Sequence, residues 1–186
     1  MDAREIYTRS SSAFGAAVHA VDGRWDAPTP LPGWDVRELV HHLVHEERWT
    51  PPLLDGATIE EVGARFDGDL LGDDPLASFD TAAAAALAAV EDVDLERVVH
   101  LSFGDRPASE YVLQLSADHL VHTWDLARAL GIDDTLDAEV VAVLLGWYVR
   151  ETEALYHRIG VIGPRVEVPG AGAQAELLGR FGRDPR

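Results

Sequence analysis

The sequence contains no cysteine and no lysine. The absence of cysteine excludes disulfides, thiolate metal ligands and a cysteine nucleophile within the chain. Any thiol chemistry therefore requires a small-molecule thiol from outside. All 15 basic residues are arginine, and 33 acidic residues outnumber them, which gives a formal net charge of −18. Because phosphate binding needs clustered cations, this balance argues against nucleic acid or an anionic membrane as a partner.

Long apolar runs are also missing. None approaches the ~20 residues that a membrane-spanning helix needs. The N-terminal stretch "MDAREIYTRSSSAFG" carries Asp2, Arg4 and Glu5 where a signal peptide would have its apolar centre. Hydrophobic residues make up 47% of the 186 positions, enough to bury a core. We therefore expect a single cytoplasmic domain over residues 1–186.

Helical spacing of apolar residues dominates the chain. The predicted helices cover residues 3–21, 36–47, 58–66, 75–91, 108–130 and 137–158, with a last turn or two in "AQAELLGR". Asp35 with Glu38 forms a capping box before the second helix, and Asp74-Pro75 marks the start of another. The segment "RVVHLSFGDRP" is the one β-like stretch. The pattern indicates an all-α bundle of four long helices with short extra helices and a minor extended segment.

The helix over residues 108–130 places a carboxylate and an imidazole in an apolar stripe. At about 100° per residue, the stripe contains Tyr111, Leu115, Asp118, His122, Leu126 and Ala129 within roughly 80° of one another. Asp118 and His122 are therefore expected to face inward. An ionised carboxylate in a core needs a partner. Either the two side chains hydrogen-bond to each other, or both ligate a metal with a third ligand from another helix.

The segment "LVHHLVHEE" is the densest source of further imidazoles. His45 points away from the apolar face of its helix, which indicates a solvated side chain. His41 and His42 flank that face at about equal angles, one on each side. Periodicity does not choose between them.

Four segments together resemble a known superfamily. They are "LPGWDVRELVHHLVHEERW", "HLSFGDRPASEYVLQL", "ADHLVHTWDLARALG" and "LLGRFGRDP". The chain is similar to the DinB/YfiT-like metalloproteins, and within them to the mycothiol-dependent maleylpyruvate isomerase type, in its short single-domain branch. The resemblance covers nearly the whole chain. It implies an up-down-down-up four-helix bundle with three metal ligands.

Carried over residue by residue, the resemblance assigns the metal ligands to His42, Asp118 and His122. The isomerase has a glutamate where this chain has Asp118, and it carries a further C-terminal domain that helps bind thiol and substrate. Two histidines and one carboxylate leave coordination positions open, as in catalytic sites. This donor set suits Zn²⁺, Ni²⁺, Fe²⁺ or Mn²⁺, with Zn²⁺ or Ni²⁺ favoured.

Three functions follow from such a site. The first is a metal-dependent thiol S-transferase or isomerase with mycothiol as co-substrate, because a coordinated thiol loses its proton. The second is a hydrolase or lyase that uses metal-bound water, with Asp125 and Glu46 as candidate bases. The third is a non-enzymatic metal-binding or ligand-binding bundle. The expected partners are a small-molecule substrate or thiol and a second copy of the chain in a homodimer.

Other polar and aromatic residues have simpler interpretations. Asp125 either orients a ligand imidazole or pairs with Arg128 on the helix surface. Arg37 is expected to pair with surface acids, and His119 to pack or lie at a rim. Tyr111 and Trp124 are expected in the core. His100 and Ser102 share the extended segment without further support for a nucleophile pair.

Overall fold

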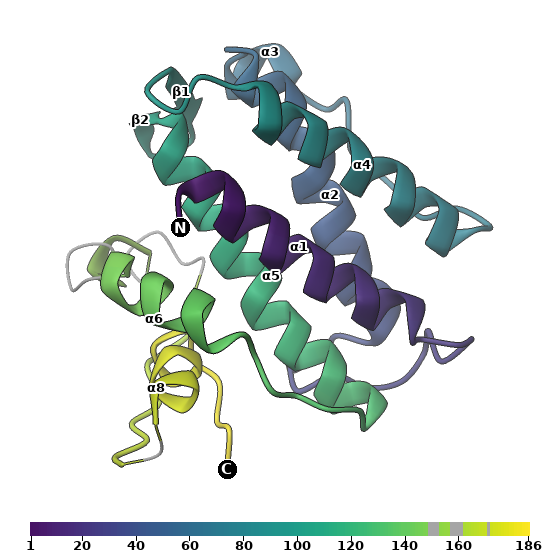
Figure 1. Cartoon of the computed structure of the whole chain (residues 1–186). Coiled ribbons are helices and arrows are strands. Elements are labelled where there is room, and N and C mark those ends of the chain that lie inside the picture. Colours follow the sequence, from purple (N-terminus) through teal and green to yellow (C-terminus); the bar gives the residue numbers. More distant parts are fainter. Residues whose placement is uncertain (149–152, 157–161, 171) are drawn as a thin grey trace. The chain divides into compact units, whose positions relative to one another are not determined.

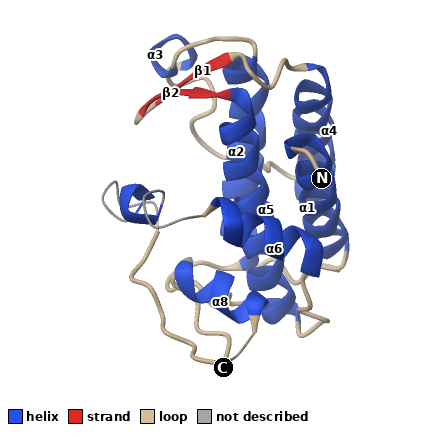
Figure 2. Cartoon of the chain, turned by 60° about the vertical axis from the view of Figure 1, so that its left-hand side comes forward, coloured by secondary structure: helices blue, strands red, loops and turns tan. Residues whose placement is uncertain are grey.

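The computed structural model describes residues 1–148, 153–156, 162–170 and 172–186. The chain divides into two compact units, Met1–Asp134 and Thr135–Arg186. The described residues are mostly helical, with one small two-stranded sheet in the first unit (Figure 2). The all-α prediction is thus confirmed at this level. The single domain over residues 1–186 stays a prediction.

The first unit contains the predicted elements, but the helix predicted over residues 36–47 extends to Leu54, and the one predicted over residues 58–66 ends at Val62. The elements are α1 (Ala3–His19), α2 (Val36–Leu54), α3 (Ile59–Val62), α4 (Pro75–Asp92), β1 (Val98–Leu101), β2 (Gly104–Pro107) and α5 (Ala108–Leu130). The extended segment before α5 is an antiparallel hairpin in which Val99 pairs with Arg106. No helix in the described parts of the chain is both long enough and apolar enough to cross a bilayer.

The residues predicted to cap the N-termini of α2 and α4 form the expected hydrogen bonds. The Asp35 side chain accepts a hydrogen bond from the Glu38 backbone N–H (2.8 Å), and Glu38 Oε2 accepts one from the Asp35 N–H (2.9 Å). This reciprocal pair satisfies two backbone donors at the start of α2. At the start of α4, the Asp74 side chain accepts from the Ala77 N–H at 3.1 Å, with Pro75 in the first turn. At its other end, α5 stops at Gly131, whose positive φ of 64° suits glycine.

Helices α1 and α5 run in one direction, and α2 and α4 run in the opposite one (Figure 1). Helix α1 packs against α5 and α4, and α2 packs against α4 and α5. Contacts at the helix ends agree with these directions. His19 Nε2 lies 2.9 Å from Asp80 Oδ1, and Arg4 donates to the Val93 carbonyl at the far end of α4. Arg37 in the first turn of α2 contacts the Gly72 carbonyl just before α4.

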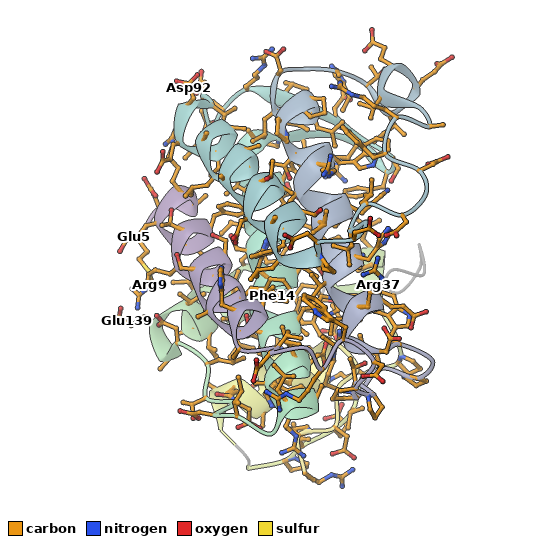
Figure 3. All side chains as sticks on the ribbon, turned by 90° about the vertical axis from the view of Figure 1, so that its right-hand side faces the viewer. Glu5, Arg9, Phe14, Arg37, Asp92 and Glu139 are labelled. Carbon is orange, nitrogen blue, oxygen red and sulfur yellow. The ribbon has the colours of Figure 1, made fainter. Side chains whose placement is uncertain are left out.

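Two clusters of buried apolar side chains form the core of the first unit. One contains Phe14, and Figure 3 shows this ring on the inner side of α1, with Glu5 and Arg9 on its outer side. The other contains Tyr111 and lies toward the hairpin. Helix α5 contributes to both clusters and is buried on most of its circumference. Several polar residues of α5, among them Ser116, His119, His122 and Asp125, are therefore buried.

The second unit contains α6 (Ala138–Trp147) and α8 (Ala173–Arg180), which pack against each other. The helix predicted over residues 137–158 is interrupted after Trp147. Helix α6 ends at Trp147 because the Tyr148 backbone (φ −79°, ψ 67°) leaves the helical region, and the Tyr148 ring stacks on Phe181 at 4.4 Å. Residues 153–156 are helical again, and the rest of the predicted helix lies outside the described residues.

We expect Asp35→Ala to destabilise the protein by about 1 kcal/mol, because it removes the N-cap acceptor of α2. Asp35→Asn keeps a good capping side chain and serves as the matched control. Urea unfolding followed by far-UV circular dichroism measures the difference in the first unit. Equal stability of the two variants would contradict the capping role.

Candidate metal centre

The structure brings together the three predicted ligand side chains, from α2 and α5. His42 Nε2 lies 3.1 Å from Asp118 Oδ2, and His122 Nε2 lies 3.4 Å from Asp118 Oδ1. One donor atom from each of the three lies within 4.8 Å of the other two. The two imidazole rings are 5.2 Å apart between centroids. The ambiguity between His41 and His42 is thereby resolved in favour of His42 as the member of this group.

The arrangement fits a small divalent cation. Donors about 2.0–2.1 Å from a tetrahedral metal lie roughly 3.3 Å from one another. The two nitrogen–oxygen separations, 3.1 Å to Asp118 Oδ2 and 3.4 Å to Asp118 Oδ1, are close to this spacing, and one donor atom from each residue lies within 4.8 Å of the others. Two nitrogen donors and one carboxylate are also the donor types that Zn²⁺, Ni²⁺, Fe²⁺ and Mn²⁺ accept.

The Asp118 carboxylate is kept ionised by its neighbours. Burial alone would raise the pKa of Asp118, but the charges of His42 and His122 and their hydrogen bonds hold this pKa well below its usual value. The side chain is nevertheless 32% exposed, whereas His122 is buried. The expectation that both face inward is thus confirmed for His122 and corrected for Asp118, which lies at the edge of the core.

Asp125 lies behind His122. Its Oδ2 atom is 2.9 Å from His122 Nδ1, and its side chain is fully buried. The two atoms lie within ion-pair distance, and a carboxylate beside Nδ1 favours the tautomer that leaves the lone pair of Nε2 available to a cation. Of the two interpretations of Asp125, the structure supports the one in which it orients the imidazole. Arg128 contacts Asp134 instead.

Trp34 covers both imidazoles. Its ring stacks on His122 at 6.2 Å with an interplanar angle of 7°, and it meets His42 edge-on at 5.4 Å. The residue sits in the loop before α2, where Thr29 Oγ1 donates to the Trp34 carbonyl at 2.9 Å. The sequence left the role of Trp34 open, because it lies outside the helical pattern that carries the histidines.

A surface cavity of about 590 Å³ opens beside His42. Its wall includes Trp34, Arg37, Glu38, His41, His42 and Asp69. The cavity connects one member of the candidate metal centre to solvent. A small molecule in this cavity therefore lies against His42.

The neighbouring polar residues of α2 are engaged elsewhere. Arg37 binds Asp69 at 3.0 Å, as predicted, and Figure 3 shows it on the outer side of α2. His41 Nε2 contacts the Gly68 carbonyl at 2.9 Å. His45 was predicted to be solvated, but its side chain is only 37% exposed, and its Nε2 accepts a hydrogen bond from the Trp49 indole.

His119 is fully buried, and its partner Glu47 was missed by the sequence analysis. Burial raises the pKa of the Glu47 carboxyl, although the hydrogen bond from His119 opposes this shift. The spacing Val40, Leu43, Glu47 places this glutamate in the apolar stripe of α2 and could have identified it. Tyr111 and Trp124 are core residues, as expected.

The extended segment holds no nucleophile pair of the kind considered. His100 Nδ1 lies 2.8 Å from Asp105 Oδ1 across the hairpin, and both side chains are exposed. Ser102 lies in the turn between β1 and β2. This histidine is therefore accounted for by a cross-strand contact.

Comparison with known proteins places these residues in a family context. The family model described as "Mycothiol maleylpyruvate isomerase N-terminal domain" matches residues 7–127, a span that includes His42, Asp118 and His122. Two relatives from Mycobacterium tuberculosis, the uncharacterized protein MT0763 (strain CDC 1551) and the uncharacterized protein Rv0738 (strain H37Rv), are each 28% identical over 177 residues. The matches cover 91% of this chain and 85% of each relative. No solved structure matches the chain significantly.

We expect Asp125→Asn to weaken divalent-metal binding at this centre by about tenfold, because outer carboxylates orient ligand imidazoles and raise their basicity. Titration with Co²⁺, followed by its visible absorption, measures the affinity. Glu110→Gln is the control, since Glu110 lies on the same helix but pairs with Arg106 at the surface. If Asp125→Asn binds Co²⁺ with the same affinity as the parent chain, Asp125 does not orient the ligand imidazole.

Proposed function

The chain belongs to the mycothiol maleylpyruvate isomerase N-terminal domain family, and from this premise we propose that it binds a divalent metal ion through His42, Asp118 and His122. We propose further that the bound metal serves a reaction of the thiol S-transferase or isomerase class, with a small-molecule thiol of the mycothiol type as co-substrate. The observation that carries the proposal is the convergence of these three donors from two helices.

The residues around the donors are suited to hold a cation. Asp118 is ionised without a metal, and it contacts both ligand nitrogens. Asp125 orients His122, and Trp34 packs on both rings. Such support limits the rotation of the ligand side chains before any ion binds.

An external thiol is consistent with both the composition and the cavity. The chain has no cysteine of its own, and the cavity gives a small molecule access to His42, one of the three donors. A bound divalent cation would supply the chemistry of holding such a thiol as its thiolate. The role of the protein side chains is to fix the cation and to shape the approach along Trp34 and His41.

The placement of the candidate bases favours thiol chemistry over hydrolysis. A hydrolase needs a base beside metal-bound water. Asp125 contacts Nδ1 of His122, on the side of the ring away from Nε2, and Glu46 pairs with His45 at 3.5 Å. Both candidate bases are thus engaged by histidine side chains.

We also infer that the four long helices of the first unit form the up-down-down-up bundle of DinB-like proteins. The directions of α1, α2, α4 and α5 support this topology, as does the long connection that joins the parallel pair α2 and α4. A connection between parallel neighbours must return along the length of the helices, which a short loop does not achieve.

The metal proposal is tested by elemental analysis of protein purified without a nickel column. We expect the parent chain to retain a stoichiometric divalent metal and His42→Ala to lose it, because one of three protein ligands is removed. His41→Ala is the control, since its imidazole contacts Gly68 instead. Equal metal content in the parent chain and His42→Ala would exclude the assigned site.

The thiol proposal is tested separately with mycothiol and the electrophile monochlorobimane. We expect the metal-loaded protein to accelerate conjugate formation, because a coordinated thiol is deprotonated at neutral pH. The acceleration should disappear in His42→Ala and persist in His19→Ala, whose imidazole pairs with Asp80 on the surface. If the metal-loaded protein forms the conjugate no faster than the background reaction, the proposed thiol reaction is wrong. The proposal of metal binding is not affected by this result.

A further inference from the structure

A second polar contact joins α2 to α5, and this one is sealed from solvent. His119 Nε2 lies 3.1 Å from Glu47 Oε1, and both side chains are 0% exposed. The His119 ring is also enclosed by α1, because Tyr7 and Phe14 meet it edge-on at 5.3 and 5.8 Å. Three helices thus converge on one imidazole that does not belong to the candidate metal centre.

The hydrogen bond between the two side chains exists wherever its proton resides. His119 Nδ1 lies 2.8 Å from the Leu115 carbonyl, and a carbonyl only accepts, so Nδ1 carries a hydrogen. One further proton then lies between Nε2 and Oε1. In either position the pair is neutral overall and remains hydrogen-bonded, so it links the helices with the proton on either partner.

Stability alone does not explain this pair. Glu47 Oε2 is buried and has no hydrogen-bond partner among the described residues. Well-packed apolar side chains in place of a buried charged pair are often neutral or stabilising, and the best-attested use of such pairs is to select one register of helix packing.

The pair is placed to control the register on which the metal donors depend. Glu47 follows His42 by five residues on α2, about 7.5 Å along the helix axis. His119 follows Asp118 directly on α5, so the two point about 100° apart around that helix. The two contacts stand at different heights on α2 and at different angles on α5, so together they restrain both the translation and the rotation of α5 against α2.

Small rotations matter at a metal site. A donor atom lies about 5–6 Å from the helix axis, so a rotation of α5 by about 10° moves it by roughly 1 Å. Metal–ligand distances tolerate deviations of only about 0.2 Å. A helix pair held by apolar contacts alone can settle in a rotation that separates Asp118 and His122 from His42.

We propose that Glu47 and His119 are positioning residues that hold α5 against α2 in the one register in which His42, Asp118 and His122 converge. The inference rests on the proposed metal site. In this proposal, Glu47 and His119 contact neither the metal nor a substrate.

The test replaces both partners at once by Glu47→Leu with His119→Leu, which leaves no unpaired buried charge. We expect this double variant to melt at or above the temperature of the parent chain and yet to bind Co²⁺ about tenfold more weakly, the size of effect seen when outer residues of metal sites are removed. The visible absorption of bound Co²⁺ should change as well, because the ligand geometry changes. A purely structural role would alter stability without altering this spectrum.

Further variants keep the test decisive. Ser116→Ala is the matched control, since the fully buried Ser116 hydroxyl donates only within α5, to the Val112 carbonyl at 2.7 Å. It should bind Co²⁺ like the parent chain. Glu47→Asp, shorter by one methylene, should also weaken Co²⁺ binding, whereas Glu47→Gln should restore it because the amide can bridge to His119.

The outcomes separate the two proposals. If the folded double variant binds Co²⁺ with the affinity and spectrum of the parent chain, the positioning role is wrong. If the double variant does not fold, unchanged affinity in Glu47→Asp overturns it. If the parent chain itself takes up no Co²⁺, the metal site fails, whatever the variants do.

Discussion

The first unit depends on the neutralisation of a carboxylate where α5 meets α2. Asp118 lies between His42 of α2 and His122 of its own helix, one carboxylate oxygen toward each ring. A half-buried carboxylate without such partners would be costly, because the protein interior replaces little of its hydration. The two imidazoles therefore stabilise the negative charge of Asp118, as a bound cation would. Because His42 is on α2 and Asp118 on α5, this interaction favours close packing of the two helices at this position.

The connections between the helices position Asp118 and the two histidines for this contact. The long connection between α2 and α4 and the hairpin before α5 let two parallel pairs of helices face each other, so that α2 and α5 are antiparallel neighbours. The loop before α2 then brings Trp34 over both imidazoles, and the capping box at Asp35 fixes where that loop ends. The ligand rings are thus restrained by a helix start, an aromatic ring and, at His122, a buried carboxylate.

Local signals in the sequence were sufficient for the starts of the long helices and for two of the three candidate ligands. Capping residues located the starts of α2 and α4, and the spacing of Asp118 and His122 placed them on one face. The choice between His41 and His42 required either the family resemblance or the packed structure, because both lie at equal angles to the apolar face. Glu47 was missed because a glutamate is presumed to be exposed, even within an apolar stripe. The end of α6 depends on the packing of Tyr148 against Phe181, which no local pattern predicts.

The two polar contacts between α2 and α5 differ in their exposure to solvent, and this difference decides which of them can bind a cation. The Glu47–His119 pair is closed to solvent on every side, so no ion or ligand can replace either partner without unfolding the region. His42 and Asp118 are about one third exposed and lie beside a cavity, so their mutual hydrogen bonds can be exchanged for bonds to an incoming cation. During such an exchange the hydrogen bond between His42 and Asp118 no longer restrains the rotation of α5 against α2, and this restraint must come from other contacts between the two helices. The Glu47–His119 contact on the same two helices provides this restraint, since it keeps the donors in place while their partners change.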